Sequence, residues 1–449
     1  MLTALGVAMY TRNIAVERDR ADAEAVRARA QEQAAERASS DLLLQHAETL
    51  MLVDPTAAAT TLEKYRGSDT TRLRRLQAEA RGRGVATATL QPHSRTISFL
   101  AADSHGAIVS AGDDGKIRVT DNTGSTTLAS NVSNYAQFGY APAPRLLAYK
   151  TASASVAILA LSTRTMTTLD AHDVAKLSIA PDGSHLATLG SDGSLTIWAL
   201  APRPEVLHRE LIPQAAYVAF TTPTQIVVKT ATALLTRSFS SSHVVRKMVP
   251  LLARWFTATS ERIAAADDQG NIHLFSTDLT LLAKSSVCQR AVYDVNTFDH
   301  RDLVAFSCGE GAAGVARLDP GTQRLIVVDR FRVSGTAYYA LPDETGERIV
   351  FSNDSNQLYV YDVATRLVSE YRGQSGRTSC IFPGSRDYDH ILVGNTRGVV
   401  QVWDPPPRQA RVLLQGPSSS GTRQARCGTL ARMGKQRSVA ARMASTSPR

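Results

Sequence analysis

A turn that recurs along the chain at nearly equal intervals constrains the fold more than any other sequence feature. It lies in the segments SAGDDGKIRV, LGSDGSLTIW, AADDQGNIHLF and VGNTRGVVQVW, whose turn glycines are Gly115, Gly193, Gly270 and Gly398. The first three glycines are 78 and 77 residues apart, close to twice about 39 residues. Asp-Gly and similar pairs between alternating apolar residues are typical of tight β-hairpins. The chain therefore repeats a hairpin unit.

Weaker copies of the unit fill the gaps, in LLAYKTASASVAIL, IVVKTATALLTRSF, LVAFSCGEGAAGVARLD and IVFSNDSNQLYVYD. The copies run from Gln91 to Gly416, and each has three apolar stretches followed by a more polar one. Four short antiparallel strands in each repeat of about 40 residues predict the blades of a β-propeller. We count eight copies. The sequence thus predicts an all-β propeller of seven or eight blades over residues 85–416.

Two segments are candidates for the outer strand that closes the last blade. One is VATATL, at residues 85–90, and the other is RVLLQG, at residues 411–416. Either the ring has eight blades and one of these strands is spare, or seven blades close and one copy is left over. The sequence leaves both alternatives open.

The third copy, AHDVAKLSIAPDGSHLATLGSDGSLTIW, resembles the consensus of the WD-repeat family. In that family a structural network joins a histidine, a Ser or Thr, the turn aspartate and a tryptophan. The resemblance places this network on His172, Thr188, Asp192 and Trp198. It implies a role in holding the blade together and no catalytic role.

Other copies keep only part of the family pattern. The first copy has His93, Ser110 and Asp114, with Thr120 at the tryptophan position. The eighth copy keeps Trp403 and Asp404, with Arg397 in place of the turn aspartate, and the fifth has Gln269 and Phe275 at these positions. The resemblance extends over residues 85–416 and is specific in copies one, three, five and eight.

Residues 1–84 have a helical pattern. Residues 1–38 combine an apolar stub, MLTALGVAMY, with a charged Ala/Glu/Arg-rich helix that serves as a spacer or a weak, coiled-coil-like partner surface,. Residues 39–84 predict a short helical unit, with helix starts at Ser40, at Pro55 and near Asp69. This N-terminal part resembles the linker between a membrane span and WD repeats in large bacterial signalling proteins, some of which begin with a serine/threonine kinase. The stub is either the remnant of such a span or a frayed helix start.

Most of the net charge of +9 lies at the C-terminal end of the chain. Residues 417–449 hold seven basic and no acidic residues, which leaves 43 basic against 41 acidic residues in the rest. Residues 417–449 are either a genuine disordered basic tail or the product of a reading-frame change. We expect no specific nucleic-acid binding by the rest of the chain. The four cysteines are widely separated and are expected to be buried small hydrophobes, in a reducing or redox-indifferent setting,.

One stretch matches a catalytic motif. DHRDL, residues 299–303, contains the kinase string H-R-D-L, yet Ser307 stands where the magnesium-binding Asn belongs and no D-F-G follows,. A turn between strands explains the string better. No P-loop, H-E-x-x-H or G-x-S-x-G motif occurs,. We therefore expect no enzyme activity, no cofactor and no metal site.

The function predicted from the sequence is a non-catalytic protein–protein interaction scaffold, which the resemblance places in bacterial signalling, either in the cytoplasm or at a membrane. The alternative is a propeller enzyme or ligand-binding domain with a site in the central channel. Five aromatic residues recur near the first strand of successive copies, and packing within the blades competes with partner binding as their role. They are Tyr135, Tyr217, Trp255, Tyr293 and Tyr338.

Overall fold

A computed structural model describes residues 2–102, 106–121, 124–133, 137–171, 173–239, 245–298, 301–373, 376–385 and 389–405. Side chains are not described at residues 2–16, 19, 21, 22, 245 and 246. The predicted tail, residues 417–449, and the candidate strand at residues 411–416 lie outside the described residues.

Three helices precede the strands: α1 (Leu2–Leu50), α2 (Pro55–Glu63) and α3 (Thr70–Gly82). Helix α1 runs without interruption through Ser40, so the helix start predicted there is wrong. Its residues 23–39 have exposed side chains, as a solvated helix with charged residues and few large aliphatic ones would,. None of the described helices has an apolar stretch long enough to cross a membrane.

The later helix starts follow capping chemistry. The Asp54 carboxylate accepts a hydrogen bond from Ala57 N at 2.8 Å, with Pro55 in the first turn of α2. Asp69 caps α3 in the same way through Arg72 N at 2.9 Å. Each cap satisfies a backbone donor that a helix leaves unpaired at its first turn.

The three helices share a small core and contact the strands. The core is formed by Leu44, Ala47, Met51, Ala58, Leu62, Tyr65, Leu76 and Ala80. Arg372 donates a 3.2 Å hydrogen bond to the carbonyl of Leu52, and the hydroxyl of Thr56 accepts a 3.0 Å hydrogen bond from Ala86 N. The helical unit is thus tied to the last two blades.

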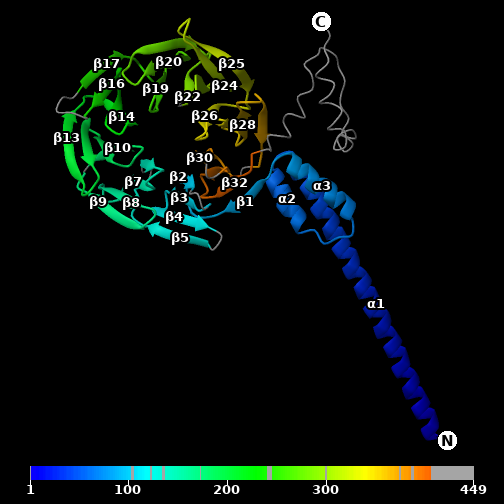
Figure 1. Cartoon of the computed structure of the whole chain (residues 1–449). Coiled ribbons are helices and arrows are strands. Elements are labelled where there is room, and N and C mark those ends of the chain that lie inside the picture. Colours follow the sequence, from blue (N-terminus) through cyan, green and yellow to red (C-terminus); the bar gives the residue numbers. More distant parts are fainter. Residues whose placement is uncertain are drawn as a thin grey trace, which may run out of the picture. The chain divides into compact units, whose positions relative to one another are not determined.

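Eight four-stranded antiparallel sheets form the ring, with the innermost strands of neighbouring sheets in contact (Figure 1). The first two blades are β2 (Ile97–Ala102), β3 (Ile108–Gly112), β4 (Lys116–Asp121), β5 (Gly124–Ala129) and β6 (Phe138–Ala141), β7 (Leu146–Lys150), β8 (Val156–Ala160), β9 (Thr165–Leu169). The next two are β10 (Val174–Ile179), β11 (His185–Gly190), β12 (Ser194–Ala199), β13 (Glu205–Leu211) and β14 (Ala215–Thr222), β15 (Gln225–Thr230), β16 (Ala233–Ser238), β17 (Val245–Pro250).

The remaining four blades follow the same plan. Blades five and six are β18 (Trp255–Ala258), β19 (Arg262–Ala266), β20 (Asn271–Ser276), β21 (Leu281–Ser286) and β22 (Val292–Thr297), β23 (Leu303–Cys308), β24 (Ala312–Asp319), β25 (Arg324–Arg332). Blades seven and eight are β26 (Ala337–Pro342), β27 (Arg348–Asn353), β28 (Leu358–Asp362), β29 (Val368–Tyr371) and β30 (Thr378–Phe382), β31 (Ile391–Asn395), β32 (Val400–Trp403) with β1 (Ala86–Leu90).

The N-terminal strand closes the ring. Strand β1 pairs antiparallel with β32, with Ala86 opposite Trp403 and Leu90 opposite Val400. The eighth blade therefore takes its outer strand from residues 86–90, and the ring has eight blades rather than seven. The predicted all-β propeller preceded by a helical segment is confirmed.

The turn glycines that revealed the repeat adopt a left-handed backbone. At Gly115, Gly193, Gly270 and Gly398 φ lies between +79° and +87°. A Cβ at Gly193 would lie 2.3 Å from the carbonyl oxygen of Ile212, so only glycine fits there. The period is visible in the sequence because each of these tight turns requires a glycine at one fixed position.

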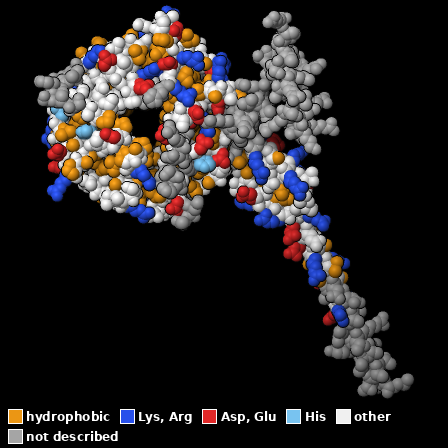
Figure 2. Space-filling view, viewed as in Figure 1, with side chains coloured by type: hydrophobic (Ala, Val, Ile, Leu, Met, Phe, Trp, Pro, Cys, Tyr) orange, Lys and Arg blue, Asp and Glu red, His pale blue; other side chains and the backbone are white. Residues whose placement is uncertain are grey.

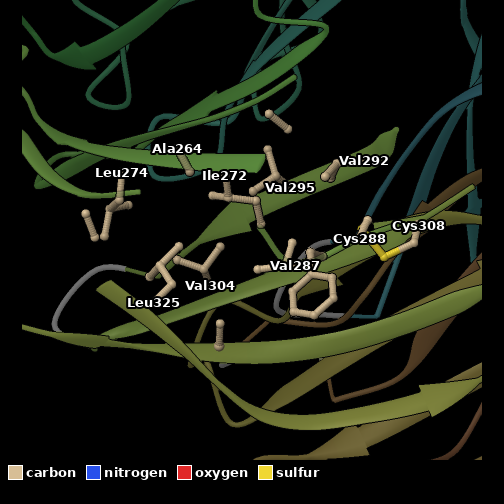
Figure 3. Close-up of a cluster of buried hydrophobic side chains, with 14 of the residues drawn as sticks. Ala264, Ile272, Leu274, Val287, Cys288, Val292, Val295, Val304, Cys308 and Leu325 are labelled. Atoms are coloured by element: carbon tan, nitrogen blue, oxygen red, sulfur yellow. A yellow bond between two sulfur atoms is a disulfide. The ribbon is translucent and has the colours of Figure 1, made fainter. Parts of the chain in front are cut away.

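Apolar cores lie between neighbouring sheets, and the one between blades five and six includes a disulfide (Figure 3). Cys288, in the connection before β22, is bonded to Cys308 at the end of β23. The expectation that these two cysteines are free buried hydrophobes is wrong: both are buried, but they are cross-linked. Their separation of 20 residues is bridged because the connection folds back against the second strand of its own blade.

Candidate functional site

The first strands of the blades line the centre of the ring, and several begin with a β-bulge. The register shifts between Val292 and Asp294 in β22 and between Ala337 and Tyr339 in β26. Tyr293 and Tyr338 are the extra residues of these two bulges, without a partner in the strand register. A bulge re-aims the side chain of the extra residue. The bulges thus place two tyrosines at the start of neighbouring inner strands.

These tyrosines belong to a longer set of ring contacts. The ring centroids of Tyr293 and Tyr338 lie 5.7 Å apart in an edge-to-face arrangement, and those of Tyr217 and Phe256 lie 6.5 Å apart. Edge-to-face pairs at such distances are favourable. Trp255 lies next to Phe256 and keeps 40% of its surface exposed.

Cationic side chains cover the rings. Lys176 Nζ lies 4.5 Å and Lys229 Nζ lies 5.3 Å from the centroid of Tyr217. The guanidinium carbon of Arg254 lies 4.8 Å from the Tyr293 centroid, and that of Arg377 lies 5.8 Å from the Tyr338 centroid. We call these residues the aromatic–cation row: Lys176, Tyr217, Lys229, Arg254, Trp255, Phe256, Tyr293, Tyr338 and Arg377.

A cavity of about 430 Å³ lies along part of the row. Its walls come from the starts of β18, β22 and β26 and from Arg377 and Thr378 at the start of β30. Figure 2 shows an opening through the centre of the ring with hydrophobic side chains gathered near it. A cavity of this volume is within the range that binds a small molecule or a partner's side chain.

Asp294 lies in the cavity wall, and its carboxylate is hydrogen-bonded mainly to backbone N–H groups. Its carboxylate accepts hydrogen bonds from Ala340 N at 3.0 Å, from Val295 N at 2.9 Å and from the Asn296 side chain at 3.2 Å. Burial raises the pKa of Asp294 to about 6. Since Ala340 belongs to the next blade, Asp294 joins two inner strands that are not paired in one sheet.

Similar side-chain bonds join other neighbouring blades. Ser178 Oγ accepts a 3.3 Å hydrogen bond from Phe220 N, between blades three and four. Ser379 Oγ donates a 2.7 Å hydrogen bond to the carbonyl of Ile97, between blades eight and one. These bonds fix the spacing of the inner strands. They therefore also fix the shape of the channel mouth, by which we mean the end of the central channel where the inner strands β18, β22 and β26 begin.

The five aromatic residues singled out from the sequence have different outcomes. Tyr135 lies outside the described residues. Tyr217, Tyr293 and Tyr338 are partly buried, and Trp255 is exposed. The four cations were missed, because a lysine or arginine in a β-stretch is normally read as a solvated side chain. Their positions in the repeat were the available signal: Lys176, Arg254 and Arg377 lie within two residues of the start of a first strand, and Lys229 lies near the end of a second strand.

The network residues of the first blade are brought together. His93 Nδ1 lies 2.8 Å from Asp114 Oδ1, and His93 Nε2 lies 3.0 Å from Ser110 Oγ. Burial lowers the pKa of His93. The hydrogen-bonded series Ser110–His93–Asp114 has the connectivity of a hydrolytic triad. Ser110 is completely buried, however, and no substrate can reach its hydroxyl. The arrangement serves to connect strands.

In the third blade, Trp198 Nε1 donates a 3.0 Å hydrogen bond to Thr188 Oγ1. Asp192 accepts from Ser194 N at 2.8 Å and holds the tight turn. His172 lies outside the described residues. The structure therefore joins Thr188 to Trp198 and places Asp192 in its turn.

Trp403, in the eighth blade, is completely buried against Tyr371, with ring centroids 5.7 Å apart. Its indole nitrogen has no hydrogen-bond partner among the described residues. In blade three, Trp198 pairs with Leu186, two residues before Thr188. In blade eight, Trp403 pairs with Ile391, and the residue two further on is Val393. An apolar side chain thus stands where the acceptor would be.

One group in the described part of the chain has the geometry of a metal site: Cys288, Cys308 and Glu310. The two sulfur atoms are bonded to each other. The Glu310 carboxylate forms an ion pair with the Arg330 guanidinium at 2.7 Å and accepts a hydrogen bond from Gln289 N at 2.9 Å. With the disulfide formed, the group offers no thiolate ligand.

The kinase-like string falls in the connection between β22 and β23. Asp299 and His300 lie outside the described residues. Asp302 is exposed and forms an ion pair with Arg262 at 2.5 Å. This is the turn position that the repeat pattern predicts.

Comparisons with known proteins agree with this geometry. The family model described as "WD domain, G-beta repeat" matches residues 84–121 and 163–199, which contain strands β1 to β4 and β9 to β12. The computationally designed Ika8 protein is similar, with a TM-score of 0.57 and 14% identity over 71% of this chain and 99% of that one. Saccharomyces cerevisiae Sqt1 has a TM-score of 0.57 and 12% identity over 72% of this chain and 100% of that one. No curated protein sequence matches. The chain folds as an eight-bladed β-propeller, and two of its segments match the WD-repeat model.

Proposed function

We propose that this chain is a non-catalytic scaffold that binds a protein partner at the channel mouth, along the aromatic–cation row. The observation that carries the proposal is the exposed Trp255 beside a cavity of about 430 Å³ whose walls come from four blades. Tryptophan, tyrosine and arginine beside a pocket are the residues that dominate binding energy at protein interfaces. WD-repeat propellers typically bind protein partners.

The composition of the cavity wall favours binding over catalysis. Among the described residues of the wall, Asp294 is the one carboxylate, and its contacts with backbone N–H groups leave it poorly placed to take a proton from a substrate,. No histidine, serine nucleophile beside a base, or free thiol lines the cavity among the described residues. A channel enzyme would need such groups from several blades.

The setting that we propose is bacterial signalling, near a membrane. This part of the proposal rests on the resemblance of residues 12–65 and 83–93 to linkers that precede WD repeats in large signalling proteins. Helix α1 is long and its residues 23–39 are exposed, which is compatible with a spacer between the ring and a preceding domain.

Site-specific photo-cross-linking tests the proposed binding face. A photoreactive residue at position 255 should capture a partner in the cells that make this protein, whereas the same residue at Leu207, which is exposed on the outer strand β13, should not. In a purified complex, Trp255→Ala should weaken binding at least about 30-fold, as an interface hot spot does. Capture of the same partner from position 207 alone would contradict the proposal.

A further inference from the structure

The charges at the channel mouth are unbalanced. Arg254 has a carboxylate partner, Asp268 at 2.9 Å. Lys176, Lys229 and Arg377 have no carboxylate within ion-pair distance among the described residues. They lie instead against the rings of Tyr217 and Tyr338. The mouth therefore presents three cations whose charge nothing described in this chain compensates.

The carboxylates of Asp294 and Asp267 accept hydrogen bonds from backbone N–H groups instead of pairing with these cations. Asp294 takes backbone hydrogen bonds within the cavity wall, and Asp267 accepts from Gln269 N and Asn271 N in its own turn. Burial lowers the pKa of Lys229, which is the direction expected for an ammonium group without a carboxylate beside it,. A ligand carboxylate would remove this penalty.

We infer that the partner segment bound at the mouth is acidic, with carboxylates that pair with Lys176, Lys229 and Arg377 and an apolar side chain that enters the cavity beside Trp255. This inference rests on the proposed function and adds the chemistry of the partner. Opposite charges across an interface select the partner and speed its association. The aromatic rings hold the cations in place before binding, which reduces the ordering cost.

A nucleic acid fits these observations less well than an acidic peptide. Bases stack on open aromatic faces, and here cations cover Tyr217, Tyr293 and Tyr338. Affinity for a phosphate backbone rises with the number of phosphates that Lys and Arg neutralise, and residues 1–416 are nearly neutral, with 43 basic and 41 acidic residues.

Three fluorescent heptapeptides test the inference with the full chain. Each has a central leucine flanked by six residues, which are all Glu, all Gln or all Lys. By fluorescence anisotropy at low salt, the Glu peptide should bind at least about 10-fold more tightly than the Gln peptide, with no binding of the Lys peptide. Arg377→Gln and Lys229→Gln should each weaken binding about fivefold.

Arg324→Gln is the matched control, because Arg324 is an exposed cation on the outer strand β25, away from the row. It should leave binding unchanged, which shows that the loss in Arg377→Gln is not a general effect of removing one surface cation. Equal loss in Arg324→Gln and Arg377→Gln, or no binding of the Glu peptide at millimolar concentration, would overturn the inference.

Two further outcomes separate this inference from the proposed function. Equal binding of the Glu and Gln peptides, both lost in Trp255→Ala, would refute the acidic partner and leave the binding face intact. Tighter binding of a ten-residue oligothymidylate than of the Glu peptide, lost in Arg377→Gln, would replace the acidic peptide by a nucleic acid. The cross-link from position 255 tests the face independently of all three peptides.

Discussion

The indole nitrogen of Trp198 donates a 3.0 Å hydrogen bond to the hydroxyl of Thr188, two residues beyond its partner across the strand pair. Thr188 is 3% exposed and Trp198 is 6% exposed, so water does not compete for the bond. The same register in blade eight holds Trp403 and Val393, without an acceptor. The comparison isolates what one hydroxyl contributes to a blade.

Thr188→Val should destabilise the protein by about 1–2 kcal/mol, because it leaves a buried N–H donor without a partner. Chemical denaturation of the full chain measures the change. Thr188→Ser, which keeps the hydroxyl, is the control and should cost less. An unchanged denaturation midpoint in Thr188→Val would show that the bond contributes nothing.

The complementary change, Val393→Thr, should stabilise the eighth blade by about 0.5–1 kcal/mol, because it supplies an acceptor for the unpaired indole of Trp403. The same substitution at Val360, which is buried in β28, adds a hydroxyl to an apolar cluster and should destabilise,. Thermal unfolding of both variants decides the point. Equal destabilisation by the two substitutions would mean that the hydroxyl at position 393 does not reach the indole.

The disulfide should make stability depend on reductant. Joining Cys288 to Cys308 closes a loop of about 20 residues, which corresponds to roughly 3 kcal/mol in the chain-entropy account. The double variant Cys288→Ser, Cys308→Ser should unfold at lower temperature than the oxidised protein and should not respond to dithiothreitol. Cys380→Ser is the control, since Cys380 is a free thiol. Oxidised wild-type protein whose unfolding ignores reductant would contradict the cross-link.

Ionisation of the buried Asp294 should lower the free energy of unfolding as the pH rises. Burial raises its folded-state pKa to about 6 from an ordinary 3.8, so the folded state binds more protons than the unfolded state between these values. Stability that is present below about pH 4 is therefore lost as the pH rises to about 6, by up to roughly 3 kcal/mol. Asp294→Asn should lack this loss when denaturation is followed from pH 4 to 7. Parallel pH profiles of the two proteins would show that Asp294 does not titrate in this range.

The sequence predicted the ring because its repeat rests on local backbone requirements. Gly193 and Gly270 stand where only a left-handed residue fits, and glycines with a left-handed backbone occupy the same turn in blades one and eight, at Gly115 and Gly398,. The number of blades was left open because ring closure is a long-range event. The partner of β32 is β1, more than 300 residues away in the chain.

The disulfide and the cations could not be found in the same way. Cys288 and Cys308 meet because a connection folds against the second strand of its own blade, and their spacing matches no local motif. Lys229 and Arg377 belong to blades four and eight, so their pairing with Tyr217 and Tyr338 depends on how distant parts of the chain are arranged in the ring. The tyrosines were found because the same strand position recurs in neighbouring blades.

Hydrogen–deuterium exchange of the full chain, with and without the partner captured from position 255, tests the central claim most directly. Binding should slow backbone exchange at the starts of the inner strands, at residues 216–219, 254–257, 292–296 and 337–341, and should leave the outer strands β13 and β25 unchanged. Protection confined to those outer strands, or to α1, would show that the partner binds elsewhere and that the aromatic–cation row is packing alone.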